Sequence, residues 1–243
     1  MRINTSLCHG LLTLTTLVLL TSCNFRRIKG NGNVIKEERQ ITAFRTLKVK
    51  DGMNVHIQQG EIKPAVIEAE SNIVPLIELV RDGEELIVRL RDDVNNVSTH
   101  GKFDVYLSSP ELDAIRVEGS GDIDVEGTLT NRESIRLRVT GSGQLSGKVD
   151  APVVDAAIAG AGDMKVSGQT RDLKVSISGV GNFNGLDLLT ENTKVNISGT
   201  GSAQVHASVT LKANITGTGD ISYKGSPQVT QSITGAGGIK QIK

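Results

Sequence analysis

Residues 135–143 read Ile-Arg-Leu-Arg-Val-Thr-Gly-Ser-Gly, an alternating apolar–polar run that ends in a Gly-x-Gly tripeptide. From residue 119 onward this tripeptide occurs seven times, at intervals of 18–22 residues. Recurrence at a nearly fixed period is typical of a repeat architecture. The fourteen glycines of the tripeptides are predicted to be the structural residues of the repeat: Gly119, Gly121, Gly141, Gly143, Gly160, Gly162, Gly179, Gly181, Gly199, Gly201, Gly217, Gly219, Gly235 and Gly237.

A β-branched residue stands two positions before the first glycine of every tripeptide, and alternation continues backwards from it, as in Ile135, Leu137 and Val139. Period-two alternation is typical of a strand with one buried face. A second short alternating run follows each tripeptide, as in Ile123 and Val125. Each unit is therefore predicted to contain a strand, a glycine corner, a second strand and a return.

Units of this length with short strands fit the coils of a parallel β-solenoid, or β-helix. One coil cannot bury its apolar face alone, so stacking would align equivalent Ile and Val side chains in ladders about 4.8 Å apart. Glycine fits the corners because the backbone there needs a positive φ or approaches another segment too closely for a Cβ. An antiparallel sandwich or barrel is the alternative, because its strands also recur between turns. The constant long period favours the all-β solenoid.

The repeats occupy residues 119–243, and residues 41–118 are less regular. The runs 47–57 and 80–90 combine alternation with an Asp-Gly step and are interpreted as degenerate versions of the same unit. Residues 41–118 are therefore predicted to form irregular N-terminal coils of one continuous domain, 41–243. The end units of a solenoid should be atypical, because an open coil exposes unpaired backbone groups.

Residues 1–22 are predicted to be a lipoprotein signal peptide. The apolar run from Leu11 to Leu20 has ten residues, too few to span a bilayer but suited to a signal peptide. Leu20-Thr21-Ser22-Cys23 follows it and resembles the bacterial lipobox, whose cysteine is diacylated and becomes the mature N-terminus. An ordinary secretory signal that ends near a cysteine is the alternative. The predicted site is lipidation of Cys23, followed by a tether over residues 23–40.

The other cysteine, Cys8, lies inside the predicted signal peptide, so the mature chain would have no thiol for disulfides or metal binding. Several acyl chains on one cysteine hold a protein to a membrane far better than a single chain. The membrane is therefore one predicted partner, through a lipid anchor in the bacterial outer membrane, on the periplasmic side or the cell surface. Asn24-Phe25-Arg26-Arg27 has no acidic residue after the anchor, which favours the periplasmic side.

The chain resembles the bacterial lipoproteins of the putative auto-transporter adhesin, head GIN domain family. Four stretches carry the resemblance: Phe44-x-x-Leu47-x-Val49, Val55-His56-Ile57-Gln58-Gln59-Gly60, Asn72-x-x-Pro75-Leu76-Ile77 and Gly119-Ser120-Gly121-Asp122-Ile123. It covers about residues 40–240. The resemblance implies a right-handed β-solenoid and a cell-envelope location, commonly in Bacteroidetes-like bacteria.

Three tripeptides continue with an aspartate, namely Asp122, Asp163 and Asp220. Calcium-binding β-rolls have a nine-residue period with one residue between glycine and aspartate. A hard cation also needs six or more converging oxygens. The aspartates are therefore interpreted as polar corner residues, and neither a metal nor another cofactor is predicted. His56, His100 and His206 have no metal-ligand spacing and are expected at the surface.

Parallel β-helices also include polysaccharide lyases and hydrolases, which use clustered carboxylates. Asp122 and Asp124 would point the same way, but Gln144 and Ser146 occupy the corresponding places in the next unit. No catalytic residue is therefore predicted and the protein is not expected to be an enzyme. A carbohydrate-active enzyme is kept as the least favoured alternative.

The 27 basic and 27 acidic residues balance, and aromatic residues make up only 2% of the chain. Neither a basic footprint nor base-stacking residues are present, so no nucleic-acid partner is predicted. The leading hypothesis is a non-enzymatic envelope lipoprotein, adhesin-like, whose solenoid binds a glycan or another ligand. The alternative is a structural, envelope-assembly or sensing module that faces the periplasm and binds a protein.

Overall fold

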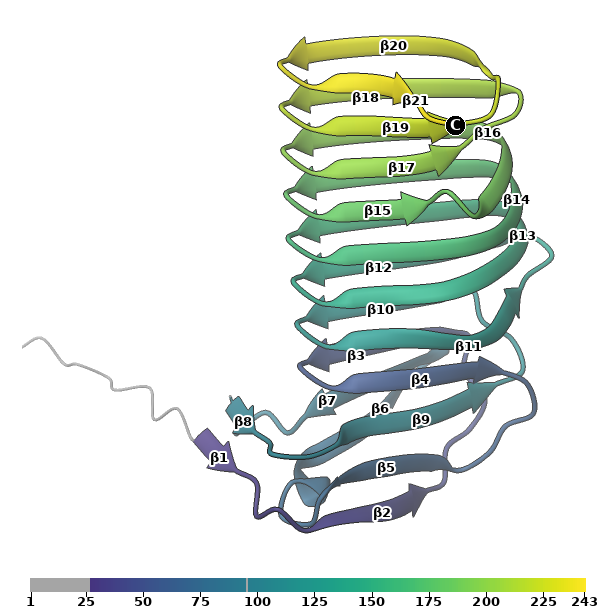
Figure 1. Cartoon of the computed structure of the whole chain (residues 1–243). Helices are drawn as coiled ribbons and strands as arrows, with labels where there is room; N and C mark the ends of the chain where they lie inside the picture. Colours follow the sequence, from purple (N-terminus) through teal and green to yellow (C-terminus); the bar gives the residue numbers. More distant parts are fainter. Residues whose placement is uncertain (1–26, 95) are drawn as a thin grey trace, which may run out of the picture.

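The computed structural model describes residues 27–94 and 96–243 (Figure 1). Apart from a short 3₁₀ helix, η1 (Val74–Leu76), every regular element in these residues is a β-strand. No helix in the described part of the chain is long and apolar enough to cross a lipid bilayer. The predicted signal peptide and Cys23 lie outside the described residues.

Residues 46–59 and 114–241 wind into a parallel β-solenoid in which each coil gives one strand to each of two faces (Figure 1). Face 1 consists of β3 (Thr46–Asp51), β10 (Ala114–Gly119), β12 (Ser134–Gly141), the second halves of β13 (Gln144–Gly160) and β14 (Asp163–Gly179), β16 (Leu188–Gly199), β18 (Thr210–Gly217) and β20 (Gln228–Gly235). Face 2 consists of β4 (Asn54–Gln59), β11 (Asp122–Thr130), the first halves of β13 and β14, β15 (Asn182–Gly185), β17 (Ser202–His206), β19 (Asp220–Lys224) and β21 (Gly238–Gln241).

Equivalent apolar residues are stacked in the interior, as the alternation predicted. Val139 pairs in register with Ile158, Ile158 with Ile177, and Ile177 with Ile197. All four are buried. Burial of each such side chain is worth about 1.5–3 kcal/mol, so the ladders are the main source of stability along the axis. The prediction of a parallel β-solenoid is confirmed.

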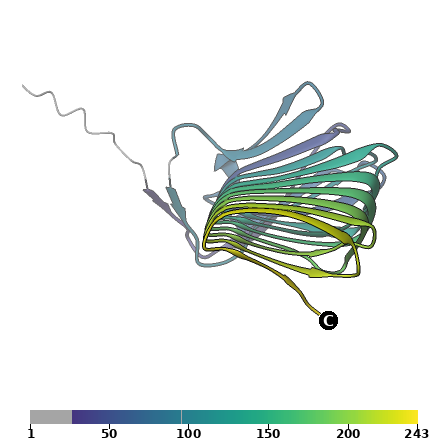
Figure 2. The ribbon, with the colours of Figure 1, turned by 90° about the horizontal axis from the view of Figure 1, so that it is seen from above.

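Two different turns connect the faces. The seven Gly-x-Gly tripeptides form a narrow corner, and Asp51, Gly52 and Met53 take their place in the first coil. The opposite turn is a wide bend, which β13 and β14 pass through without interruption. Figure 2, seen from above, shows the coils stacked nearly in line, with the narrow corner at one end and the wide bend at the other.

The N-terminal end of the solenoid is closed by a layer that we call the cap. On face 2, β9 (Phe103–Ser109) pairs in parallel with β4, and β5 (Ala65–Glu70) and β2 (Val34–Arg39) follow in antiparallel order. On face 1, β7 (Glu85–Leu90) pairs in parallel with β3 and antiparallel with β6 (Ile77–Asp82). The cap lies at the base of the stack in Figure 1, where it covers the edges of the first coil.

Residues 80–90 are not the degenerate coil unit that the sequence indicated. They belong to the antiparallel hairpin β6–β7, and Gly83 adopts φ 55° in its turn. An alternating run with an Asp-Gly step fits a hairpin as well as a coil corner, and only the pairing of the strands distinguishes them. The run 47–57 does form a strand–corner–strand unit, β3 and β4.

The prediction of a tether over residues 23–40 is wrong for residues 27–40, which are the part that the structure describes and which include two paired strands. β1 (Arg27–Lys29) pairs in parallel with β8 (Asn96–Ser98), and β2 pairs with β5. Between β1 and β2, the Gly32 amide donates a hydrogen bond of 2.7 Å to the buried carboxylate of Glu70. The segment is therefore part of the fold, held by residues that lie far from it in the sequence.

Candidate functional site

The two glycines of each tripeptide meet different constraints at the narrow corner. The first glycine has a positive φ, between 116° and 129°, in all seven tripeptides. A Cβ on the second glycine would lie 2.1–2.5 Å from a carbonyl oxygen of the preceding coil. At Gly179, for example, the carbonyl accepts hydrogen bonds from the amides of Thr200 and Gly201, at 2.9 and 3.1 Å. The corner is thus closely packed backbone, without room for a ligand.

The aspartates that follow the tripeptides join successive coils. The Oδ1 atoms of Asp122, Asp163 and Asp220 each accept the backbone amide of the equivalent residue in the next coil, at 2.9–3.2 Å. Gln144 and Ser146 lie beside Asp122 and Asp124, as predicted. No group of three or more His, Cys, Asp or Glu side chains within residues 27–94 and 96–243 is arranged to hold a metal ion.

The three histidines lie in three different places. The His56 ring stacks on Tyr106, with 4.7 Å between ring centroids, and lies 3.9 Å from carboxylates of Asp104 and Glu126. His100 Nδ1 lies 3.9 Å from Glu70. His206 is half-buried at the end of β17. The structure therefore does not bring them together.

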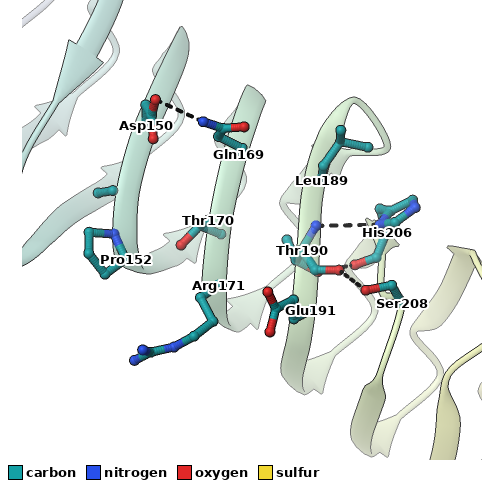
Figure 3. A pocket seen from close by; sticks show the side chains of 11 residues that line it. Asp150, Pro152, Gln169, Thr170, Arg171, Leu189, Thr190, Glu191, His206 and Ser208 are labelled. Atoms are coloured by element: carbon teal, nitrogen blue, oxygen red, sulfur yellow. Dashed lines mark hydrogen bonds between the residues drawn. The ribbon is translucent and has the colours of Figure 1, made fainter.

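The wide bend carries an open groove of ≈ 570 Å³ that crosses four successive coils (Figure 3). Three of the coils contribute the residues on either side of the turn, and the fourth contributes the end of β17 and the residues after it. We call this the bend groove. Its lining residues are Asp150, Ala151, Pro152, Gln169, Thr170, Arg171, Leu189, Thr190, Glu191, His206 and Ser208.

Arg171 and Glu191 stand at the turn of two neighbouring coils and fall outside the strand register. Their side chains therefore form no aligned ladder. Strand pairing fixes the residues before and after them, and leaves these two positions exposed at the turn. Gln169 Nε2 donates to Asp150 Oδ2 at 2.9 Å, which links two neighbouring coils. Leu189 adds an apolar surface, 57% exposed.

Buried hydroxyls support the floor of the groove. The Oγ1 atoms of Thr190 and Thr193 are 2.6 Å apart, and both hydroxyls hydrogen-bond the carbonyl of His206. The Thr190 amide donates to His206 Nδ1 at 3.4 Å, so the neutral ring carries its proton on Nε2. Ser208 Oγ donates to the Thr190 carbonyl at 3.1 Å. These bonds keep the chain rigid where it leaves regular strand geometry.

The charged groups at the turn are held in place by their neighbours. Arg171 Nε donates to Asp172 Oδ2 at 2.8 Å, and Asn192 Nδ2 donates to Asp172 Oδ1 at 3.0 Å. The hydrogen bond from Arg171, with that from Asn192, lowers the pKa of Asp172 below its usual range, and the same contact raises the pKa of Arg171. Both groups are therefore charged at neutral pH.

The groove hydroxyls donate to carbonyl oxygens and not to a base, so they are not activated as nucleophiles. What the arrangement provides is a row of hydrogen-bond donors and acceptors beside an apolar side chain, on a rigid support. Such a surface suits reversible binding of an extended polar molecule. The groove residues share no motif, so the sequence pattern did not predict them. The only signal was the recurrence of a polar or proline residue at Pro152, Arg171 and Glu191, 19–20 residues apart.

The fold and the groove define a capped parallel β-solenoid with a polar lateral groove. The chain belongs to the family described as "Putative auto-transporter adhesin, head GIN domain", whose model matches residues 43–227 and so includes the bend groove. The resemblance noted in the sequence is thereby confirmed.

Several solved structures share the fold. A putative adhesin from Bacteroides fragilis has 25% sequence identity and a TM-score of 0.82, over 88% of this chain and 100% of that one. A putative lipid binding protein from Parabacteroides distasonis has 22% identity and a TM-score of 0.72, over 90% and 100% of the two chains. A putative adhesin from Parabacteroides merdae has 23% identity and a TM-score of 0.71, over 89% and 99%. No curated protein matches the chain.

Proposed function

We propose that this protein is a non-enzymatic, adhesin-like lipoprotein of the bacterial outer membrane that binds an extended glycan in the bend groove. The observation that carries the proposal is the groove itself, which crosses four coils and combines hydrogen-bonding side chains with exposed Leu189. Sugars present both hydroxyl groups and apolar ring faces, so both kinds of contact are needed. The anchor would be the acylated Cys23.

Rigid support favours binding in this groove. Gln169, Thr190 and Ser208 are hydrogen-bonded to a neighbouring coil, so less conformational entropy is lost at these side chains when a ligand binds. The family description and the Bacteroides fragilis neighbour, both adhesins by description, agree with the proposal. Binding without catalysis agrees with hydroxyls that contact carbonyls, and with a His206 Nδ1 that accepts the amide of Thr190.

A glycan array tests the proposal. The full chain, purified in detergent, should bind a subset of immobilised oligosaccharides. The double variant Arg171→Ala/Glu191→Gln should lose about tenfold or more in affinity for them. Arg171→Ala removes the guanidinium donors, and Glu191→Gln replaces a charged acceptor with a weaker neutral one, which together cost about 1.4 kcal/mol or more. The matched control Arg81→Ala/Glu61→Gln changes two exposed side chains in or next to the cap and should bind as the wild type does.

Two results would contradict the proposal. One is the absence of binding to every glycan on the array by a chain whose circular dichroism shows folded β-structure. The other is a loss of binding of equal size in the groove variant and the control variant. Either result would favour the alternative of a structural or assembly module that faces the periplasm.

A further inference from the structure

A column of lysines on face 1 has a counter-charge at one end only, at Asp155. Lys174, Lys194 and Lys212 occupy the same register position in three successive coils, and all three are exposed. Lys174 lies 3.8 Å from Asp155, but Lys194 and Lys212 make no ion pair within residues 27–94 and 96–243. Neighbouring strands are about 4.8 Å apart, and like charges at that separation destabilise a sheet.

The neighbouring columns of the solenoid are built differently. Beside the lysines, Asn192 donates to Asp172 at 3.0 Å and Thr210 donates to Asn192 at 2.8 Å. Further along the same strands, Asn214 donates to Asn196 at 2.9 Å. Polar side chains at these positions satisfy one another from coil to coil, whereas the lysines repel one another.

A hollow of ≈ 380 Å³ lies between the lysine column and the column of Asp172, Asn192 and Thr210. Its walls therefore offer ammonium groups on one side. The other side offers amide and hydroxyl groups and the carboxylate of Asp172, which already accepts hydrogen bonds from Arg171 and Asn192. This hollow shares no lining residue with the bend groove.

The lysine column is part of a charge asymmetry between the faces. Although the formal net charge of the chain is zero, the outward positions of face 1 carry mainly basic residues. The basic ones in the coils are Lys48, Lys50, Arg116, Arg136, Arg138, Lys174, Lys194 and Lys212, against the acidic Asp51, Glu118, Asp155 and Asp172. Lys48 and Arg116 are ion-paired with Glu85 of β7, and Arg138 and Lys174 with Asp155, so Lys194 and Lys212 belong to the part of the face where the basic charge is not compensated. A field of one sign over one face attracts ligands of the opposite sign.

We propose that the lysine column binds a linear anionic polysaccharide, a chain whose sugars carry carboxylate or sulfate groups. The lysines repeat along the axis at the coil spacing, which is comparable to the length of one sugar ring, so successive acidic sugars can meet successive lysines. The amide and hydroxyl column can hydrogen-bond the sugar hydroxyls at the same time. Nucleic acid is less suited, because the described outward positions of face 1 have no aromatic side chain on which bases could stack. The site adjoins the bend groove, since Arg171 hydrogen-bonds Asp172, but the two share no lining residue.

Biolayer interferometry of the full chain in detergent, across a series of salt concentrations, tests this site. The probe is polygalacturonate, and the neutral reference is the same polymer fully methyl-esterified. The wild type should bind the acidic polymer and not the ester. The variant Lys194→Gln/Lys212→Gln should bind about tenfold or more weakly, and its salt dependence should fall by about one for each lysine removed.

Two control variants make the result specific. Lys148→Gln/Lys165→Gln removes two exposed lysines from face 2, an equal change in charge, and should bind as the wild type does. Lys194→Arg/Lys212→Arg keeps the charge and should retain binding. The thermal midpoint of Lys194→Gln/Lys212→Gln should stay the same or rise, because a repulsion is removed.

Three outcomes would overturn the proposal. They are equal losses in the face 1 and face 2 variants, equal binding of the esterified polymer, and tighter binding of single-stranded DNA or of anionic lipid vesicles than of polygalacturonate. Loss of binding in the groove variant Arg171→Ala/Glu191→Gln, with the lysine variant unaffected, would also overturn it while supporting the bend groove.

Discussion

At the scale of single residues, the repeated tripeptide needs glycine twice and for two reasons. The first glycine adopts a backbone conformation that other residues rarely adopt, and at both positions a Cβ would lie 2.0–2.6 Å from a carbonyl oxygen of the preceding coil. Asp51 stands at the first position in the first coil and adopts a different positive φ from the glycines. It has φ 67°, and its carboxylate compensates by accepting the Leu90 amide at 2.8 Å. Aspartate is one of the few residues that tolerate this conformation.

The substitution Gly181→Ala tests the second position. An alanine Cβ would lie 2.3 Å from the Gly162 carbonyl and 2.6 Å from the Ile158 side chain, so the coils must separate. We expect a loss of about 1–3 kcal/mol in the free energy of unfolding, measured by urea denaturation.

Gly60→Ala is the matched control, because a Cβ at this position would have no atom within 4 Å of it and the φ of Gly60 is not in the left-handed region. It should change the free energy of unfolding by less than about 0.5 kcal/mol. Equal urea midpoints for the two variants would show that close packing at the corner is not what the repeat requires.

At the scale of elements, Arg45 and Asp113 join the segments that precede β3 and β10. Arg45 Nε donates to Asp113 Oδ2 at 2.7 Å and Arg45 Nη2 donates to Oδ1 at 3.0 Å. Asn131, before β12, donates to the same carboxylate at 2.8 Å. Together these bonds connect three successive levels of face 1 where the cap meets the repeats.

This contact predicts a dependence of stability on pH. The hydrogen bond from Arg45, with that from Asn131, lowers the pKa of Asp113 in the folded state. A lowered carboxyl pKa contributes stability that is present above the unfolded value, about 3.9, and is lost as pH falls through the folded pKa. Urea midpoints measured from neutral to acid pH should therefore fall more steeply for the wild type than for Asp113→Asn. Parallel curves for the two proteins would contradict this.

The regular coils could be predicted from sequence because their two signals are local. Alternation predicts each strand and Gly-x-Gly predicts each corner, so the coils after Gly119 could be predicted from the sequence. The cap could not be predicted, because β6–β7 uses the same alternation in antiparallel pairing. The segment around Gly32 could not either, since its partner Glu70 is distant in sequence. The bend groove lacks a repeated residue type, so no period indicated it.

At the scale of the whole molecule, the predicted anchor at Cys23 would fix which end of the solenoid faces the membrane. Only residues 24–26 separate Cys23 from β1, and four residues span at most about 14 Å. β1 lies beside the cap end of the stack (Figure 1). A lipid on Cys23 would therefore hold the cap end near the bilayer, with the bend groove several coils further out.

The substitution Cys23→Ser tests the anchor. We expect the wild type to incorporate an alkyne-labelled fatty acid in growing cells and to sediment with the outer membrane. Cys23→Ser should lose both properties, whereas Cys8→Ser, in the predicted signal peptide, should keep both. Labelling of Cys23→Ser, or sedimentation of the wild type with soluble proteins, would contradict the predicted lipidation.

The measurement that tests the central claim most directly is hydrogen–deuterium exchange of the full chain, with and without the glycan that it binds most tightly on the array. If the bend groove is the binding site, exchange should slow at residues 150–151, 169–171, 189–191 and 206–208, which line the groove around the unpaired positions Pro152, Arg171 and Glu191. Exchange at the Gly-x-Gly corner should not change. Slowing confined to the cap or to the last coil, with the bend unaffected, would contradict the account.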